Sequence, residues 1–159
     1  MRCLVVSDTH GRQGNLEKVI QKVGHIDMLI HCGDVEGFEE HIRGLVDCEV
    51  HMVRGNCDTF SDLPREDVFS VGKYTIFLTH GHHYKVNYGT EDLKNAAMER
   101  WADIAIYGHT HIPMVDQSEL VMAINPGSLT QPRQDGHQPS FLIMETDRFG
   151  EIHFALNYL

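Results

Sequence analysis

Three observations predict an α/β protein, built as a layered sandwich of two sheets with helices on the outside. Short apolar segments at 2–7, 28–32 and 49–53 are typical of parallel strands that are buried on both faces. Helical patterns separate these segments, so we expect the first third of the chain to be βαβαβ. The C-terminal segments are joined by turns with no helix between them, which favours antiparallel pairing and a second sheet.

Each of the first two helices is predicted from an apolar stripe on one helix face. The stripe of the first is formed by Leu16, Val19, Ile20 and Val23, and Asn15 is its expected N-cap. The stripe of the second is formed by Phe38, Ile42, Leu45 and Val46.

The rest of the chain predicts one more helix and five more strands. The strands are expected at 74–80, 103–108, 120–125, 140–147 and 151–158. Thr90 is the expected cap of the helix between the first two of these strands, and Leu93, Ala97 and Trp101 form its apolar stripe.

The length and charge of the chain limit the possible functions. The 159 residues suit a single domain, since roughly 100–200 residues per domain is usual. A net charge of -10 argues against non-specific nucleic-acid binding, which needs a basic surface. The chain shows no signal-peptide pattern and no apolar run near the ~18 residues of a membrane span. We therefore expect a cytoplasmic protein that does not enter membranes. The sequence is compatible with a monomer and with a homo-oligomer.

Polar side chains collect where the predicted strands end. The seven that matter are Asp8, His10, Asp34, Asn56, His80, His109 and His111. Each alone has an ordinary explanation, such as a turn residue or a hydrogen-bonded histidine. Ligands bind beyond the carboxyl ends of strands in α/β sheets, however, and the joint pattern of carboxylates, a carboxamide and imidazoles predicts a metal centre there. Glycines beside most of these residues allow backbone to approach a small site closely.

Seven ligands are too many for one tetrahedral zinc ion and suit two ions. Oxygen ligands mixed with imidazoles favour Mn²⁺, Fe, Zn²⁺, Ni²⁺ or Co²⁺ over calcium or magnesium. The two histidines of 109–111 are separated by one residue, so one imidazole can reach each ion. The sequence thus predicts a dinuclear centre.

The same clusters, in the same order, resemble the signature of the calcineurin-like metallophosphoesterase superfamily. The motifs are Asp8-Thr9-His10, Gly33-Asp34, Gly55-Asn56-Cys57-Asp58, the single His80, and 108–111. The NPGS sequence at 125–128 and the PR sequence at 132–133 are similar to a mark of its small bacterial and archaeal phosphodiesterase branch. The resemblance implies a four-layer αββα sandwich of two mixed sheets flanked by helices, with residues 1–159 as one domain and no cap domain.

The resemblance also implies how the ligands are shared. Asp8, His10 and His111 are expected to hold one ion, and Asn56, His80 and His109 the other, with Asp34 bridging both. Manganese is the first choice of metal, and nickel, cobalt, iron and zinc are alternatives. The implied activity is that of a phosphodiesterase in which a metal-bridging hydroxide attacks the phosphorus atom. The expected catalytic residues are Asn56, Asp58 and His109.

The expected substrate is a small phosphodiester or nucleotide-like molecule, and Cys57, Arg12 and Arg54 are its expected contacts. Cys57 occupies the position at which the family usually has a histidine that protonates the leaving group. Because a thiol is a poor donor, we expect a preference for leaving groups that depart without help. Tyr84, Lys85 and Tyr88 are candidates for the rim of the site, or else members of a solvated loop.

Two rival functions follow from the same residues. One branch of the superfamily, the small retromer subunit, keeps the fold and uses its surface as a scaffold for protein partners. A metal-sensing protein is the other alternative, although the neutral Asn56 is a weak ligand for a site built for affinity alone. The complete set of seven ligands favours the enzyme.

Overall fold

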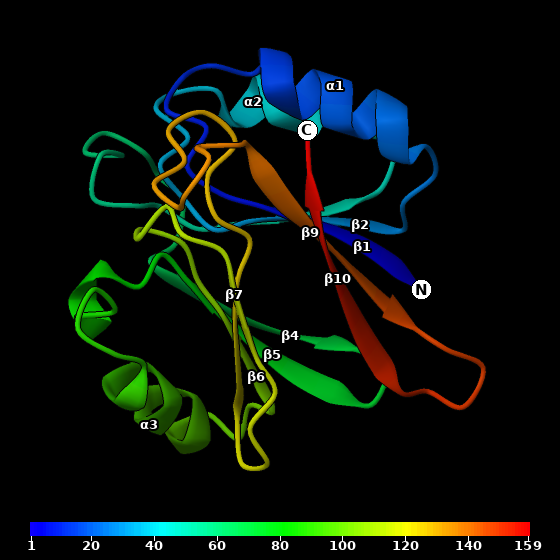
Figure 1. The fold of residues 1–159 in the computed structure, drawn as a ribbon, viewed down its shortest axis with the longest axis vertical. Coiled ribbons are helices and arrows are strands. Elements are labelled where there is room, and N and C mark those ends of the chain that lie inside the picture. The colour runs from blue at the N-terminus through cyan, green and yellow to red at the C-terminus, as the bar shows by residue number, and fades with distance from the viewer.

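A computed structural model describes the protein from Met1 to Leu159, and Figure 1 shows its two five-stranded sheets. The strands of the first sheet are β1 (Arg2–Val6), β2 (Met28–His31), β3 (Glu49–Met52), β9 (Ser140–Thr146) and β10 (Ile152–Tyr158). Those of the second are β4 (Glu66–Val71), β5 (Tyr74–Thr79), β6 (Ile104–Ile106), β7 (Met114–Asp116) and β8 (Met122–Asn125). The helices are α1 (Gly14–Val23), α2 (Glu39–Arg43), the short 3₁₀-helix η1 (His82–Tyr84) and α3 (Glu91–Glu99). None of the helices has the length and apolar character needed to cross a membrane.

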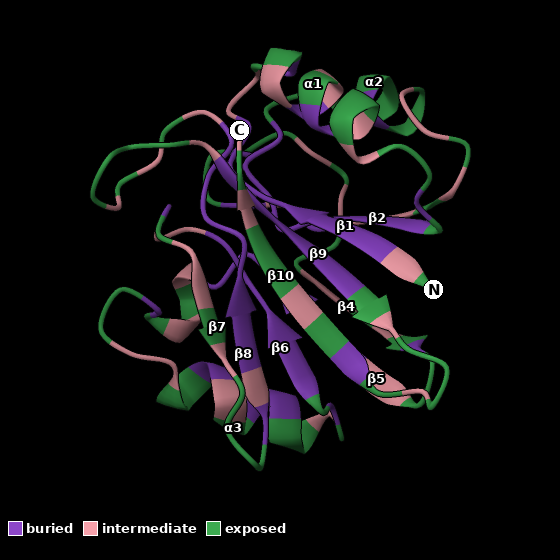
Figure 2. Ribbon diagram, turned by 45° about the vertical axis from the view of Figure 1, so that its right-hand side comes forward, coloured by how far each residue is buried: buried purple, intermediate pink, exposed green.

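Alternation of side chains along the central strands builds four layers. On β1, Cys3 and Val5 belong to the apolar cluster between the two sheets, while Leu4 and Val6 belong to the cluster beneath α1 and α2. On the second sheet, Phe77 faces a third cluster, which includes Leu93 of α3. Helices therefore cover both outer faces, as Figure 1 shows, and the buried central strands are visible in Figure 2. The predicted αββα sandwich is confirmed.

The first sheet has the order β10-β9-β1-β2-β3. Strands β1, β2 and β3 pair in parallel, as the βαβαβ pattern predicts. The two C-terminal strands pair antiparallel, as expected, but β9 adds to β1 in this sheet instead of helping to form the other. The expectation that the helix-free C-terminal part supplies a second sheet is therefore wrong for β9 and β10.

The second sheet has the order β4-β5-β6-β8-β7. Strand β8 pairs in parallel with β6, which corrects the antiparallel pairing expected for 120–125. The reason is that the chain leaves β6, forms the edge strand β7, and then returns between the two as β8. Strands β5, β6 and β8 consequently point their carboxyl ends to the same edge.

Several helix predictions need correction at their ends. Helix α1 begins at Gly14, so Asn15 lies inside it, and the Asn15 amide donates to the Leu129 carbonyl instead of capping. Helix α2 has only five residues. Phe38 precedes it at the N-cap position and is 39% exposed, so it does not belong to a buried stripe.

Helix α3 also differs from its predicted pattern. Thr90 occupies the N-cap position, but its side chain makes no capping hydrogen bond. Trp101 lies beyond the end of α3, has a positive φ of 57° and is 89% exposed, so it does not extend the apolar stripe.

Candidate metal centre

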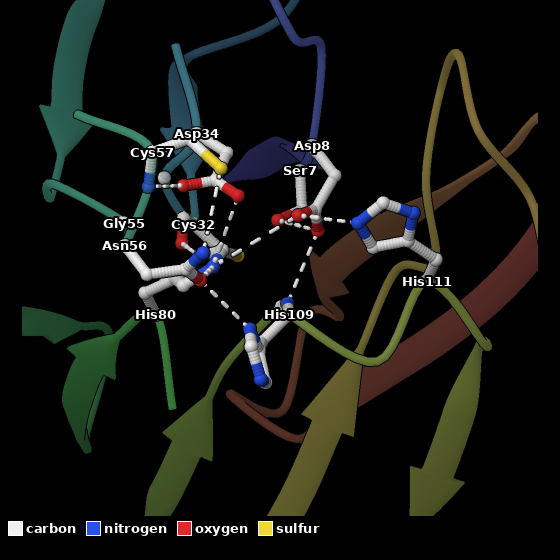
Figure 3. A network of polar contacts seen from close by, with 12 residues as sticks. Ser7, Asp8, Cys32, Asp34, Gly55, Asn56, Cys57, His80, His109 and His111 are labelled. Atoms are coloured by element: carbon white, nitrogen blue, oxygen red, sulfur yellow. Dashed lines mark hydrogen bonds and ion pairs between the residues drawn. The ribbon is translucent and has the colours of Figure 1, made fainter. Parts of the chain in front are cut away.

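The carboxyl ends of strands from both sheets meet at one site. The Asp8 amide donates to the Gly33 carbonyl at 3.1 Å, which joins the loops after β1 and β2. In the second sheet, the Gly108 amide donates to the His80 carbonyl at 3.1 Å and joins the loops after β5 and β6. The structure thereby gathers all seven side chains singled out in the sequence, most of which Figure 3 shows together.

Four of these residues form a first group, in which all the ligand atoms lie within 4.8 Å of one another. Its members are Asp8, His10, Asp34 and His111. Oδ1 of Asp8 lies 3.1 Å from Nε2 of His111, and that nitrogen lies 3.3 Å from Nε2 of His10. Asp8, His10 and His111 are the three residues that the family resemblance implies for one ion.

The other three residues form a second group around the Asn56 side chain. Oδ1 of Asn56 lies 3.1 Å from Nε2 of His80 and 2.9 Å from Nδ1 of His109. Asp34 connects the two groups, because its Oδ2 lies 3.4 Å from Nε2 of His80 and 3.7 Å from Nε2 of His10. The Asp34 carboxylate therefore lies between the two groups of candidate ligands.

Hydrogen bonds to backbone carbonyls orient two of the imidazoles. Nδ1 of His80 donates to the Cys32 carbonyl at 2.8 Å, and Nδ1 of His111 donates to the Gln131 carbonyl at 2.7 Å. Each Nδ1 therefore carries a proton, and the neutral form of each ring has the lone pair of Nε2 toward the centre. Metal-binding histidines commonly use their outer nitrogen in this way.

The two remaining imidazoles have side-chain partners that sequence reasoning missed. Nδ1 of His10 lies 2.7 Å from Oε1 of Glu36, and Nε2 of His109 lies 3.0 Å from the amide nitrogen of Asn87. Both partners lie in loops outside the five motifs. Asn87 lies between Lys85 and Tyr88, in the segment 80–89 that the sequence suggests for the rim of the site, and Glu36 lies two residues after Asp34.

The charges of the centre fit a cation. Burial raises the pKa of Asp8, but the hydrogen bond with His111 and the charge of His80 outweigh it and bring the pKa below its ordinary value. The same balance, with His80 as the main partner, lowers the pKa of Asp34. Both carboxylates are thus ionised, and Oδ1 of Asp8 is a buried atom that accepts no hydrogen bond apart from its contact with the His111 imidazole. An ionised buried carboxylate is costly without a compensating charge, so dications suit these oxygen and imidazole ligands.

The backbone of the centre is strained in a way that is typical of functional sites. Five of the seven residues have a positive φ, which residues other than glycine seldom adopt. They are Asp8, His10, Asp34, His109 and His111, with φ between 44° and 68°. The neighbouring glycines provide room, since a Cβ at Gly55 would overlap the Asp34 carboxylate.

The remaining motif residues surround the second group. Asp58 is buried, and its two oxygens accept hydrogen bonds from the backbone of Gly55 at 2.7 Å and of Glu36 at 2.6 Å. The backbone N–H of Cys57 donates to Oδ1 of Asp34 at 2.9 Å. The side-chain amide of Asn56 donates to the Cys57 sulfur at 3.4 Å. Partial burial and the Asp34 charge raise the pKa of Cys57 to about 12.

The NPGS sequence holds the loops of the centre in place. The Asn125 amide donates to the Gly108 carbonyl at 2.9 Å, and the Ser128 hydroxyl donates to the Asp8 carbonyl at 2.9 Å. The hydroxyl of Thr130 donates to the same Asp8 carbonyl at 2.9 Å. This segment therefore ties a loop of the first sheet to a loop of the second.

The structure separates the two predicted arginine contacts. Arg12 is exposed on the loop after β1. Arg54 is half-buried and lines a groove of about 290 Å³, together with the candidate ligand Asn56 and with Arg65, which sequence reasoning missed.

Two of the three candidate rim residues are engaged elsewhere. Tyr84 packs against Phe77 and donates to Glu66, and Lys85 pairs with an aspartate of α3. Tyr88 is 92% exposed.

Comparison with known proteins gives a consistent result. The family model of the calcineurin-like phosphoesterase superfamily domain matches residues 1–148. The probable metallophosphoesterase YsnB of Bacillus subtilis is 34% identical over 134 residues, which cover 84% of this chain and 78% of that protein. Phosphodiesterase YfcE of Escherichia coli K12 is 30% identical, over 99% of this chain and 93% of its own. A crystal structure of Vps29 from Entamoeba histolytica complexed with zinc has a TM-score of 0.78 and 25% identity, and covers 99% of both chains. The matched family model and these relatives confirm the resemblance carried by the five motifs, and the chain belongs to the calcineurin-like phosphoesterase superfamily.

Proposed function

We propose that the protein is a metal-dependent phosphodiesterase that uses two divalent ions to hydrolyse a small phosphodiester or nucleotide-like substrate. The observation that carries the proposal is the position of Asp34. Its Oδ2 lies between Nε2 of His10 and Nε2 of His80, each of which belongs to a separate group of ligands. One carboxylate oxygen between two ligand groups is the arrangement that a pair of neighbouring ions requires.

In this proposal Asp8, His10 and His111 hold one ion, Asn56, His80 and His109 hold the other, and Asp34 contacts both. When bound, two such ions supply a nucleophile by lowering the pKa of a shared water molecule, and they stabilise negative charge on the phosphoryl oxygens. Manganese is our first choice, and the ligand types also suit nickel, cobalt, iron and zinc.

The side chains near the ions have separate roles. The Asn56 amide can leave its weak bond to the Cys57 sulfur and donate to a phosphoryl oxygen. Asp58 fixes the backbone of Gly55 and Glu36 and acts as a positioning residue. Cys57 keeps its proton, because its pKa is about 12, and a thiol donates hydrogen bonds weakly. We therefore expect leaving groups that depart without protonation to react fastest.

Two features support a diester over a monoester. Escherichia coli YfcE, which matches nearly the whole chain, is a phosphodiesterase by name. Two grooves also lie along the loop that carries Asn56 and Cys57, and Asp58 and Thr59 line both of them. The Arg54 groove has about 290 Å³, and a second groove of about 370 Å³ is lined by Glu36, Cys57 and neighbouring residues. A phosphodiester needs room for two substituents on phosphorus, and two grooves provide it.

The test compares hydrolysis of bis(p-nitrophenyl) phosphate and p-nitrophenyl phosphate by chelator-treated protein to which Mn²⁺ is returned. We expect metal-dependent cleavage that favours the diester and is lost in Asp34→Ala. Asp62→Ala, at an exposed aspartate outside both ligand groups, is the matched control and should keep full activity. Binding of two ions with no hydrolysis in Mn²⁺, Ni²⁺, Co²⁺ or Zn²⁺ would contradict the proposal.

A scaffold for protein partners is the second candidate, and the similarity to Vps29 favours it. That Vps29 structure contains zinc, so metal binding does not by itself distinguish an enzyme from a scaffold. Turnover does distinguish them. A protein that binds metal with unchanged fold and no phosphoesterase activity would be assigned to the scaffold class.

A further inference from the structure

Two arginines without partners share the groove beside Asn56. Arg2 and Arg100 are paired with glutamates elsewhere in the structure. The guanidinium groups of Arg54 and Arg65 have no hydrogen bond or ion pair, and both line the Arg54 groove. The other lining residues are all polar or glycine: Gly55, Asn56, Asp58, Thr59, His82 and His83. Such a surface suits a charged ligand and not an apolar one.

The backbone holds these two arginines together. The Arg54 amide donates to the Pro64 carbonyl at 2.9 Å, which fixes the residue before Arg65 beside the end of β3. In the β4–β5 ladder, Glu66 pairs with Thr79, so Arg65 lies next to the candidate ligand His80. Their positions are therefore set by both sheets and lie beside the metal centre.

Charge makes this groove unlike its surroundings. The chain has a net charge of -10, and the neighbouring groove, which Cys57 lines, also has Glu36 and Glu39 in its wall. Two neighbouring guanidinium groups repel each other unless an anion lies between them. Asp58, the one acidic residue of the Arg54 groove, already accepts two backbone hydrogen bonds. His82 adds a buried Nδ1 atom that has no partner.

We propose that the Arg54 groove binds a second phosphate group of the substrate, so that the preferred substrates are diphosphate diesters, in which two esterified phosphates share a bridging oxygen. The proposal rests on the phosphodiesterase function proposed above. Arginine suits this role because its planar fork binds phosphate oxygens in pairs.

The groove also compensates for the weak proton donor at Cys57. Water adds to one phosphorus, the bridging P–O bond breaks, and the second phosphate leaves with the electron pair of that bond. The two guanidinium groups stabilise the charge on this leaving phosphate, and the protons of the water pass to solvent. The products are two phosphate monoesters, and a phosphate leaving group needs no proton from the enzyme. The absence of a histidine at position 57 and the presence of Arg54 and Arg65 in the groove then favour the same substrates, namely those with a phosphate leaving group.

The experiment compares a diphosphate diester with a monophosphate diester of the same nucleosides. Di(adenosine-5′) diphosphate has the diphosphate bridge, and adenylyl-(3′→5′)-adenosine has a single phosphodiester between the same nucleosides. With excess Mn²⁺, we expect kcat/KM of the intact protein to favour the diphosphate by about 10-fold or more. In Arg65→Gln and Arg54→Gln this preference should fall by about 10-fold, mainly through KM, with a smaller change for bis(p-nitrophenyl) phosphate. Arg148→Gln removes an arginine that stacks on Phe149 and should keep the preference.

The outcomes separate the two proposals. Cleavage of bis(p-nitrophenyl) phosphate with no preference for the diphosphate would overturn the second-phosphate site and leave the phosphodiesterase intact. A preference that survives in both arginine variants would also overturn it. No cleavage of any diester would reject both proposals. Thermal unfolding checks that the variants fold, and Arg65 is exposed, so its replacement leaves the core unchanged.

Discussion

Oδ1 of Asp8, at the end of a strand in the first sheet, lies 3.1 Å from Nε2 of His111, in a loop of the second sheet. The candidate metal centre thus lies at the junction of the two sheets. Each sheet contributes ligands to both groups, because Asp34 of the first group and Asn56 of the second follow strands of the first sheet, and His111 of the first group and His80 of the second follow strands of the second.

The first prediction concerns which ion each aspartate holds. Asp8→Asn removes the charge that faces His111, so we expect one of the two ions to bind at least ~100-fold more weakly while the other remains bound. Asp34→Ala should weaken the binding of both ions, because Oδ2 of Asp34 lies near His10 in one group of ligands and near His80 in the other. Calorimetric titration of chelator-treated protein with Mn²⁺ measures the stoichiometry. Equal losses in the two variants would refute the assignment of Asp34 as the shared ligand.

The second prediction concerns the partner of His10. Glu36→Ala removes the acceptor that lies 2.7 Å from Nδ1 of His10, so we expect affinity for one ion to fall by about 10–100-fold. Glu36→Gln keeps an acceptor oxygen and should lose less. Glu40→Ala, at an exposed glutamate of α2, is the control and should bind metal normally. The same affinity in Glu36→Ala and the unaltered protein would show that Glu36 does not orient the imidazole.

The third prediction concerns the leaving group. Cys57→His introduces a better proton donor at an exposed position that is fixed by its backbone bond to Asp34. We expect hydrolysis of alkyl phosphodiesters to accelerate by about 10-fold or more, because general acids contribute most when the leaving group is basic. Aryl esters such as bis(p-nitrophenyl) phosphate should change little.

The comparison of the two substrates provides the internal control for Cys57→His. A uniform change in both rates would indicate altered metal binding and not proton donation. Unchanged hydrolysis of alkyl esters would contradict the role we assign to this position.

Much of the metal centre is predictable from sequence because its ligands directly follow apolar strands. Asp8 and Asp34 each come within three residues of a buried strand whose pattern is visible in the chain. Parallel strands then bring these ends together without further information. Asp8 and Asp34 both have a positive φ, but this does not prevent their prediction as ligands, since sequence motifs are recognised from residue types and not from backbone dihedral angles.

The unpredicted features depend on contacts between distant segments. Strands β4 and β7 lie at the two edges of their sheet, where half-exposed side chains leave no clear apolar pattern. The pairing of β9 with β1 has no local signal at all. Arg65 and Asn87 belong to the site only because folding places them beside Arg54 and His109.

The last prediction concerns acid stability and His31, which is fully buried beneath the metal centre. Its Nδ1 accepts a hydrogen bond from the Gly33 amide at 3.2 Å, and its Nε2 lies 3.1 Å from the Thr9 hydroxyl. Burial lowers the pKa of His31 from 6.5 to about 4. Between these pH values the unfolded chain binds a proton that the folded chain does not. The contribution of His31 to the free energy of unfolding therefore falls as the pH falls from 6.5 toward 4, by on the order of 3 kcal/mol. His82 and His109, whose pKa values burial also lowers, act in the same direction.

Urea unfolding of metal-free protein at pH 7 and pH 4.5 measures this loss. His31→Gln cannot be protonated, so its free energy of unfolding should decrease less between the two pH values, whatever its stability at pH 7. His25→Gln replaces an exposed histidine and should show the full decrease. The pKa values of Asp8 and Asp34 are lowered in the folded protein, so the stability that these carboxylates contribute is lost only at still lower pH and does not affect this comparison. If His31→Gln and the unaltered protein lose the same free energy, the buried neutral imidazole is not the cause of acid sensitivity.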